Sequence, residues 1–542
     1  MKSRRAFFST LLLSLSATHL EAWECPLSEG WSITLENQKP GEDPEHLVHF
    51  EDGVLHMYRD VPAGEKVPFG VVTTDKSFSR YHLRFEYRWI GKRFEPRARE
   101  LRDAGVLYHV QDASTVWPSG PECQIQEGDT GDLIYIRTGG LTWMRPAGSP
   151  APDGQGDPGL LPENGGVPRF FEPSWPYIGR FEEADSPSGW NRVDIFVDRD
   201  ESVHIVNGRI IARSAGMVGV DGKPLTEGRI CFQLEGAEIQ YRNLEIDETS
   251  TPAVETDSKL VSLSSVKGHD SRKKTVKVVR PAGSSINAVR LVGTDAASFE
   301  IVERNEGSDE WTIAFHPQHG RGRYSAGLEI GTPSSDSGPG TVVFLQGIAL
   351  DAFEGENEPP LQDIVHALGI PLDVGGTELS LNKEEATIGE SVDASYFTAV
   401  GGGKIRITQL ARFSPPGATP IGIFFRGKEE LTEIGRLAES GNPPDAHQSL
   451  LPPWQGGMET IEIDAPAEPF GFYMQGHHYT SFTDPERPSE ATIPRTTRIY
   501  PVRFFQNERR ENAWIVGFEE ASNGDYQDSV LLVEGVQPVE AP

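Results

Sequence analysis

PECQIQEGDTGDLIYI, residues 121–136, is the stretch that decides the fold of the first part of the chain. Its opening alternates, so Glu122, Gln124 and Gln126 project to one face of a strand and the apolar residues between them to the other. Three long polar side chains in a row suit the floor of an open groove better than a closed core. A sharp acidic turn with two glycines follows and leads into an apolar run.

The rest of the composition fits a chain built from strands. With 542 residues the chain is too long for one domain, and two to four domains are expected. It contains 57 Gly and 41 Pro, short alternating runs are frequent, and helical periodicity is scarce, which favours β-sandwiches. The formal net charge of −31 repels nucleic acid and anionic membranes, so neither DNA nor RNA is expected as a partner.

The first 22 residues are typical of an export signal. Lys2, Arg4 and Arg5 precede an apolar run over residues 6–15, and small residues follow. The arginine pair also resembles a twin-arginine signal, but an ordinary Sec signal is the preferred interpretation. No later segment is apolar enough to cross a membrane. We therefore expect an exported protein, periplasmic or extracellular, with no membrane insertion.

Three cysteines are too few for a disulfide framework. Cys123 shares a strand face with Ile125, whereas Cys231 lies opposite the apolar side of its own strand, so alternation argues against a bridge between them. Cys25 remains a possible partner for either. Buried or unreactive thiols are the preferred interpretation.

Polar linkers divide the mature chain into three predicted β-sandwiches. The expected domains are residues 23–250, a two-sheet jelly roll of about ten strands, residues 258–352, with immunoglobulin-like spacing, and residues 361–540, a third sandwich with a short helix at 361–368. The second domain resembles immunoglobulin-like spacer modules of secreted bacterial proteins. The fold class is therefore predicted to be all-β.

Within the first domain, one strand and one loop add detail. Residues 83–89 alternate cleanly, with Leu83, Phe85, Tyr87 and Trp89 on one face. Residues 141–190 are rich in Pro, Gly and acidic side chains, and we expect them to lack regular structure. The aromatic segment in this loop either covers a groove and stacks on a sugar ring or only plugs the edge of the sandwich.

The end of the chain resembles the C-terminal signature of domain of unknown function 4114, a β-sandwich of exported bacterial proteins. The resemblance rests on WIVGFEEASNGDYQDSV, residues 514–530. Glu519, Asn523, Asp525 and Asp528 in this stretch, with the neighbouring Glu520, offer hard oxygen ligands that suit Ca²⁺. An acidic turn without metal explains the same residues equally well.

Residues 45–247 resemble the 3-keto-disaccharide hydrolase domain, also called domain of unknown function 1080. The resemblance rests on HLRFEYRW, AGVLYHV, ECQIQEGDTGD, GWNRVDIFVDRDESVHIVNGRII and LTEGRICFQLEGAEIQYRNLEI, in the order of the family. It implies a concanavalin-like fold and cleavage of 3-keto-glycosides. The chain departs from the family at Asp103-Ala104-Gly105, where Asn-Ser-Gly is common, and in the loop 141–190.

The implied chemistry needs a base, an acid and an oxyanion donor. A 3-keto group acidifies the C2 hydrogen of a sugar, so the glycosidic bond can break by β-elimination with water added afterwards. The candidate catalytic residues are Glu122 as base, His109 or His204 as acid, and Glu235 as a second carboxylate. Arg88, with Arg84 in reserve, is predicted to stabilise the oxyanion. Further substrate-binding candidates are Gln124, Gln126, Gln233, Trp175 and Tyr177.

Two other interpretations stay open beside the favoured enzyme. A carbohydrate-binding module would use the same sheet face, with its Gln, Arg and aromatic residues, to hold a glycan without cleaving it. A surface-matrix protein would need no site at all, which fits the long C-terminal part that shows no catalytic motif. In each interpretation the only expected cofactor is Ca²⁺, and the partner of the first two is a carbohydrate.

Overall fold

The structure of the chain is a computed structural model. It describes residues 23–24, 30–148, 159–178, 189–248, 254–269, 271–279, 286, 288–305, 309–331, 340–439 and 447–539. Strands dominate, which confirms the all-β prediction, and the α-helix α1 (Leu361–Ala367) forms where a short helix is predicted. No helix in the described residues is long and apolar enough to cross a membrane.

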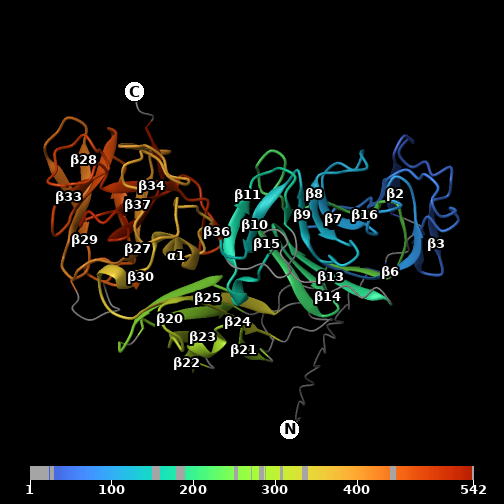
Figure 1. The fold of residues 1–542 in the computed structure, drawn as a ribbon, viewed down its shortest axis with the longest axis horizontal. Helices are drawn as coiled ribbons and strands as arrows, with labels where there is room; N and C mark the ends of the chain where they lie inside the picture. Colours follow the sequence, from blue (N-terminus) through green and yellow to red (C-terminus); the bar gives the residue numbers. More distant parts are fainter. Residues whose placement is uncertain are drawn as a thin grey trace, which may run out of the picture.

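Three units lie next to one another (Figure 1). The first unit, blue to green, and the C-terminal unit, orange to red, form the two ends of the molecule, and the middle unit, yellow-green, lies below and between them. We call it the immunoglobulin-like unit after the resemblance predicted above. Each unit contains two β-sheets.

The first unit is a sandwich of a ten-stranded and a seven-stranded sheet, both antiparallel throughout. The ten-stranded sheet runs in the order β11 (Val167–Phe171), β10 (Gly139–Met144), β15 (Arg209–Val218), β14 (Glu201–Val206), β13 (Asn191–Asp198), β6 (Arg80–Arg93), β17 (Ala237–Asp247), β4 (Val54–Met57) and β3 (Val48–Glu51), with β1 (Trp23–Glu24) paired to β17. The seven-stranded sheet runs in the order β12 (Tyr177–Ile178), β9 (Leu133–Ile136), β8 (Gly120–Gln124), β7 (Gly105–Val110), β16 (Arg229–Leu234), β5 (Gly70–Thr74) and β2 (Trp31–Leu35).

The core of the first unit lies between these two sheets. The four apolar residues of the alternating run in β6 are buried there, as the alternation predicts. Cys123 belongs to the same core, whereas Cys231 lies in a separate cluster on the opposite face of the seven-stranded sheet. Both thiols are free, so the prediction of no bridge between them is confirmed. Cys25 lies outside the described residues.

The prediction that residues 141–190 lack regular structure is wrong for part of them. β10 and β11 extend one edge of the ten-stranded sheet, and β12 extends one edge of the seven-stranded sheet. The strands form because the apolar residues near Leu141 and Phe170 pack against neighbouring units. Local composition alone did not reveal this packing.

The immunoglobulin-like unit consists of two four-stranded sheets. One runs in the order β18 (Glu255–Thr256), β20 (Lys274–Val279), β23 (Glu310–Phe315) and β22 (Phe299–Asn305), and the other in the order β19 (Leu260–Val266), β25 (Thr341–Leu350), β24 (Gly322–Ile330) and β21 (Val289–Val292). β19 and β25 pair in parallel, and the remaining neighbours are antiparallel.

The C-terminal unit has two six-stranded sheets and a projecting hairpin. One sheet contains β29 (Leu431–Arg436), β28 (Pro420–Phe425), β32 (Phe470–Gln475), β26 (Phe397–Ala399) and β39 (Val536–Pro538), with β33 (Thr480–Phe482) on β32. The other contains β30 (Ser449–Leu450), β27 (Lys404–Arg412), β38 (Ser529–Glu534), β37 (Ala513–Phe518) and β34 (Thr497–Pro501), with β31 (Thr460–Asp464) on β27. The hairpin is β35 (Phe504–Phe505) and β36 (Glu508–Arg509).

The three units meet at one apolar cluster. Leu141, Trp143 and Ala215 of the first unit pack there with Leu260 and Phe344 of the second and Phe504 of the hairpin. Burying this shared surface stabilises the units against one another.

Candidate active site

Polar side chains gather on the outer face of the seven-stranded sheet, opposite the core. Glu122 and Gln124 project there from β8, and Gln233 projects from β16, with β7 between the two strands. The alternation predicted for residues 121–126 is therefore confirmed. The face is less open than predicted, because Glu122 is only 3% exposed and Gln233 only 1%.

A glycine makes room for these groups. A Cβ atom at Gly105 would lie 1.7 Å from Oε1 of Glu122 and 1.9 Å from Oε1 of Gln233. Both side chains therefore lie over the bare backbone of β7, where no other residue type fits without displacing them. Gly105 brings the two polar groups from flanking strands to the same point.

Three carboxyl groups, Asp103, Glu122 and Glu235, form what we call the carboxyl cluster. All three are at most 9% exposed. The guanidinium of Arg97 donates through Nη1 to Asp103 and, over 2.6 Å, to Oε2 of Glu235. Gln126 Nε2 donates to Asp103 over 3.3 Å. Arg97 thus pairs with two of the three buried acids.

This imbalance raises the pKa of every member of the carboxyl cluster. Burial, followed by the charge of Asp103, raises the pKa of Glu235 to about 8. Burial and the neighbouring Glu235 and Asp103 hold the pKa of Glu122 well above its usual range, and burial also raises that of Asp103. A carboxyl group with a raised pKa keeps its proton at a pH where an ordinary carboxyl group is ionised, as an acid catalyst requires.

Several polar atoms of this site have no hydrogen-bond partner within the described part of the chain. They are both amide atoms of Gln233 and Oδ1 of Asp103. A buried polar group without a partner costs about 1–3 kcal/mol, so such groups are rare unless a ligand or water satisfies them. The arrangement is that of a site for a polar ligand.

An aromatic row, Phe69, Trp117 and Trp175, borders the same face. Ring centroids lie 5.5 Å apart between Phe69 and Trp117 and 6.5 Å apart between Trp117 and Trp175. Arg97 lies 5.6 Å from the centre of the Phe69 ring, which joins the row to the carboxyl cluster. Trp175 is 53% exposed, and the guanidinium of Arg137 lies 5.5 Å from its ring centre.

Two further residues that were predicted to bind substrate are Gln124 and Tyr177. Gln124 stays on the face, but its side-chain oxygen accepts a hydrogen bond from the backbone of Ile125. Tyr177 pairs through its backbone with Ile134, which in turn pairs with Glu122. The side chain of Tyr177 lies outside what the structure describes.

The structure does not place His204 beside Glu122, as its predicted role as the acid requires. Its ring lies between the two sheets, where Nε2 contacts the hydroxyl of Tyr108 at 3.0 Å and Nδ1 contacts the carbonyl of Gly131 at 2.9 Å. Burial lowers its pKa to about 4. Tyr108 faces the core side of the seven-stranded sheet, so that sheet separates His204 from the carboxyl cluster.

His109 is a core histidine as well. It follows Leu107 on β7, but its φ of 55° and an irregular register between β7 and β16 turn the side chain inward. Nε2 contacts the carbonyl of Arg199, and burial lowers the pKa of the ring to about 4. The structure therefore places neither predicted histidine with Glu122.

The prediction that Arg88 or Arg84 lies beside Glu122 to stabilise the oxyanion is also wrong. They project from the outer face of the ten-stranded sheet, on the far side of the sandwich from Glu122. Arg88 donates to Oε1 of Gln240 over 2.8 Å and lies 4.5 Å from the Trp190 ring centre, while Arg84 pairs with Asp194 and Glu245. The cation of the carboxyl cluster is instead Arg97.

Four residues of the site are missing from the sequence prediction: Asp103, Arg97, Gly105 and Trp117. Arg97 lies in a basic segment between strands, and no periodicity shows which acids it contacts. Gly105 could have been recognised from the sequence, because a glycine inside a strand often marks a point where another group closely approaches the backbone. Trp117 lies in a loop over the outer face, anchored by Ala113 among Leu107 and Ile134.

Replacing Arg97 with Met is expected to lower the free energy of unfolding by about 3 kcal/mol, because two buried carboxyl groups would lose their cation. Urea denaturation of the full chain at pH 7 measures this change. The matched control is Arg93→Met, which removes a more exposed partner of Glu127 and is expected to cost less than about 1 kcal/mol. Equal costs for the two variants would contradict the buried pairing.

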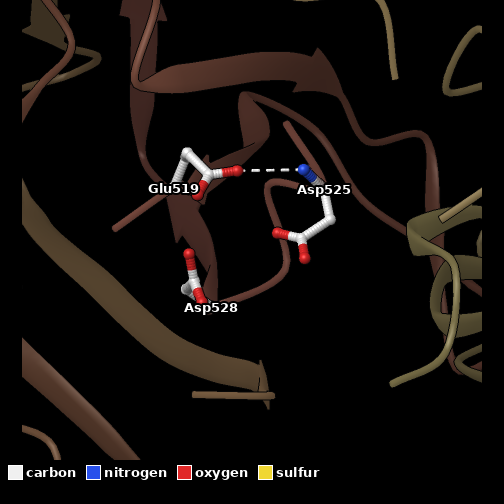
Figure 2. Close-up of side chains that lie close together, drawn as sticks. All are labelled: Glu519, Asp525 and Asp528. Atoms are coloured by element: carbon white, nitrogen blue, oxygen red, sulfur yellow. Dashed lines mark hydrogen bonds between the residues drawn. The ribbon is translucent and has the colours of Figure 1, made fainter. Parts of the chain in front are cut away.

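A second group of acids lies in the C-terminal unit (Figure 2). We call Glu519, Asp525 and Asp528 the carboxylate triad: one ligand atom of each lies within 4.8 Å of the others, and all three are buried. Among the described residues no Lys, Arg or His side chain donates a hydrogen bond to them. This buried triad could hold a metal ion.

Asn523 and Glu520 do not complete this group. Asn523 donates its amide hydrogen to Oδ2 of Asp525 over 2.5 Å instead of presenting its oxygen, and Glu520 contacts Nδ1 of His477 at 3.1 Å. Glu519 accepts backbone hydrogen bonds from four later residues, so it also anchors the turn: the donors are Ala521, Ser522, Gly524 and Asp525. Oδ1 of Asp525 has no partner in the described residues.

One known family matches the first unit. Residues 26–247 match the family described as the 3-keto-alpha-glucoside-1,2-lyase-like domain. This part of the chain is similar to 3-keto-glucoside lyase-like domains, and the match begins earlier than the predicted residue 45. The immunoglobulin-like and domain-of-unknown-function-4114 resemblances of the other units stay predictions.

Three solved structures are similar to this chain over the same region. Carbohydrate binding module CBM66 from Bacillus subtilis is 7% identical, with 40% of this chain and 95% of that chain covered and a TM-score of 0.25. The Bacillus licheniformis beta-glucanase is 8% identical (41% and 95% covered, TM-score 0.22), and a Bacillus subtilis protein of unknown function with a galectin-like fold is 14% identical (40% and 89% covered, TM-score 0.21). No curated protein matches the chain. At these TM-scores the similarities support no further conclusion.

Proposed function

We propose that the first unit cleaves 3-keto-glycosides on the outer face of its seven-stranded sheet. The observation that carries the proposal is the carboxyl cluster, one member of which, Glu122, meets the unpartnered amide of Gln233 over Gly105. The family match of residues 26–247 supports the substrate class. The N-terminal residues further support the proposal that the protein is exported.

The proposed reaction is a β-elimination across C1 and C2 of the keto sugar. Glu235, with a pKa of about 8, takes the C2 proton in its ionised form. The electron pair of the C2–H bond forms the C1=C2 double bond as the bond from C1 to the glycosidic oxygen breaks. Glu122, whose pKa is held well above its usual range, gives its proton to the departing oxygen. Water added to the double bond completes a net hydrolysis.

Arg97 and Gln233 are proposed to hold the keto group while charge develops on it. Proton removal at C2 places negative charge on the 3-keto oxygen, and a preorganised guanidinium or amide N–H stabilises that charge. Arg97 therefore takes the role predicted for Arg88. Because the polar groups are nearly buried, entry of a sugar requires the segment that carries Arg97 to move.

Turnover of a panel of 3-keto-glycosides by the full chain, with and without a chelator, tests the proposal. We expect release of the leaving sugar or alcohol from at least one member. A second candidate function, glycan binding without cleavage, is favoured by the exposed ring of Trp175. Saturable binding of the panel without release of any product would support that alternative and overturn the enzyme.

The pH dependence follows from Glu235. Because the base must be ionised and its pKa is about 8, kcat/KM is expected to rise about tenfold per pH unit up to pH 8. At higher pH it is expected to fall again where Glu122 loses the proton that it must donate. This rising limb of the pH profile reports the titration of the whole carboxyl cluster, because the three acids titrate together. Asp103→Asn removes the charge that raises the pKa of Glu235, so its limb should lie at lower pH. An unmoved limb in this variant would exclude Glu235 as the base.

We also propose that the carboxylate triad binds Ca²⁺. The available ligands are hard carboxylate oxygens, with no His or Cys among them, and this set suits Ca²⁺ better than Zn²⁺. Three buried carboxylates without a hydrogen-bonded cation are costly, and a divalent ion offsets that cost. The ion has no part in the sugar chemistry, because the triad and the carboxyl cluster belong to different units.

A further inference from the structure

One buried side chain connects the carboxylate triad to the linker between the second and third units. Gln527 is fully buried, and its Nε2 donates to Oδ2 of Asp525 over 3.0 Å and to Oε2 of Glu358 over 3.1 Å. Glu358 lies in the linker, residues 352–360. Gln527 therefore contacts a predicted metal ligand at one side and the linker at the other.

Glu358 in turn connects both flanking units. Its carboxylate is only 4% exposed and also accepts a hydrogen bond from Nε2 of Gln448 in the C-terminal unit over 2.9 Å. Its backbone carbonyl accepts from Nη2 of Arg321 in the immunoglobulin-like unit over 2.8 Å. Arg321 also donates to the carbonyl of Glu356. The linker is thus fixed to one unit through its main chain and to the other through the Glu358 side chain.

The buried oxygens around Gln527 lack partners. Oδ1 of Asp525, Oε1 of Gln527 and Oε1 of Gln448 accept no hydrogen bond from any residue that the structure describes, although each side chain is fully buried. Oxygens of this kind, next to four buried carboxylates, are matched to a hard cation. Without one, mutual repulsion of the carboxylates loosens the loop that carries Gln527.

From this geometry we propose, on the basis of the calcium site proposed above, that Ca²⁺ at the carboxylate triad fixes the linker through Gln527. The ion orders the loop over residues 519–528, the ordered loop positions the Gln527 amide, and the amide holds Glu358. Calcium thereby sets the docking of the immunoglobulin-like unit on the C-terminal unit. Gln527 acts as a positioning residue between the ion and the linker.

Hydrogen–deuterium exchange of the full chain, chelated and then with 1 mM CaCl₂, tests the coupling. Calcium is expected to slow exchange of peptides spanning residues 352–360 by at least about tenfold. Gln527→Ala should still bind calcium in calorimetry, more weakly because coupling is reciprocal, yet lose most of the slowing. Glu358→Ala, which lies outside the triad, should lose it as well. Gln537→Ala, an exposed residue of β39, is the control and should behave as the wild type.

The outcomes separate the two proposals. If neither the wild type nor Asp525→Asn binds calcium, the proposed calcium site is wrong, and the proposed coupling is wrong as well. If calcium binds and Asp525→Asn abolishes binding, but linker exchange is unchanged by calcium or equally slowed in Gln527→Ala, only the coupling is overturned.

Discussion

Replacing Glu122 with Gln is expected to lower the turnover of 3-keto-glycosides by about a thousandfold while the chain still folds. The amide keeps the shape of the side chain over Gly105 but has no acidic proton to give to the leaving oxygen. The leaving group then departs as an unprotonated alkoxide, which is slow. Initial rates with a saturating 3-keto-glycoside measure the loss, and thermal unfolding of the same sample shows whether the fold is intact.

The matched control for this variant is Glu245→Gln. Glu245 is also a carboxylate on an outer sheet face, but it pairs with Arg84 on the opposite side of the sandwich. Its replacement should leave turnover within about twofold of the wild type. Retention of more than a tenth of wild-type turnover by Glu122→Gln would remove Glu122 from the chemistry.

Gly105→Ala is expected to reduce turnover by about 100-fold at little cost in stability. The new methyl group meets only the ends of two flexible side chains, Glu122 and Gln233. These ends can swing aside, so the free energy of unfolding should fall by about 1 kcal/mol. The catalytic groups, however, would leave the point at which they converge. Denaturation and initial-rate measurements on one preparation separate the two effects.

Gly228→Ala is the matched control, for which we expect the opposite result. Its Cβ would lie 2.3 Å from the backbone carbonyl carbon of His109, which cannot swing aside. We expect a loss of about 3 kcal/mol in stability but normal turnover per folded molecule. Normal turnover in Gly105→Ala, with its structure intact, would contradict the placement of the site over β7.

The sequence predicts the sheet face well because that part of the fold is local. Alternation within β8 places Glu122 on the outer face from neighbouring residues alone. Gln233 on β16, and Glu235 directly after that strand, follow by the same rule. Their assembly into one cluster depends on strand order, and this is why Arg97, which lies between strands, could not be assigned.

The predictions for the two histidines are wrong for two different reasons. The side chain of His109 departs from alternation because its backbone adopts a left-handed φ. His204 lies on the inner face because Ser202, His204 and Val206 point inward, whereas the apolar Val203 and Ile205 point outward. Val203 is apolar for another reason, because it lines a cavity of about 370 Å³ shared with the immunoglobulin-like unit. The periodicity of residues within one strand does not reveal contacts between units.

The acidic turn of the C-terminal unit was predictable as a group of ligands but not as a geometry. Spacing suggested Asn523 as an oxygen donor, and the structure uses it as a hydrogen-bond donor to Asp525. Nε2 of Gln527 donates a hydrogen bond to Glu358, which is 169 positions away in the sequence. No local pattern encodes such a contact.

Deuterium incorporation at C2 is the most direct test of the central claim. The full chain and a 3-keto-glycoside are incubated in D₂O, and the released keto sugar is analysed by NMR at early times, with Glu122→Gln as the blank for spontaneous exchange. Elimination by the carboxyl cluster predicts one deuterium at C2 of each released sugar, well above the blank. Release of sugar that retains its C2 hydrogen would show that the bond breaks without proton abstraction and would contradict the account.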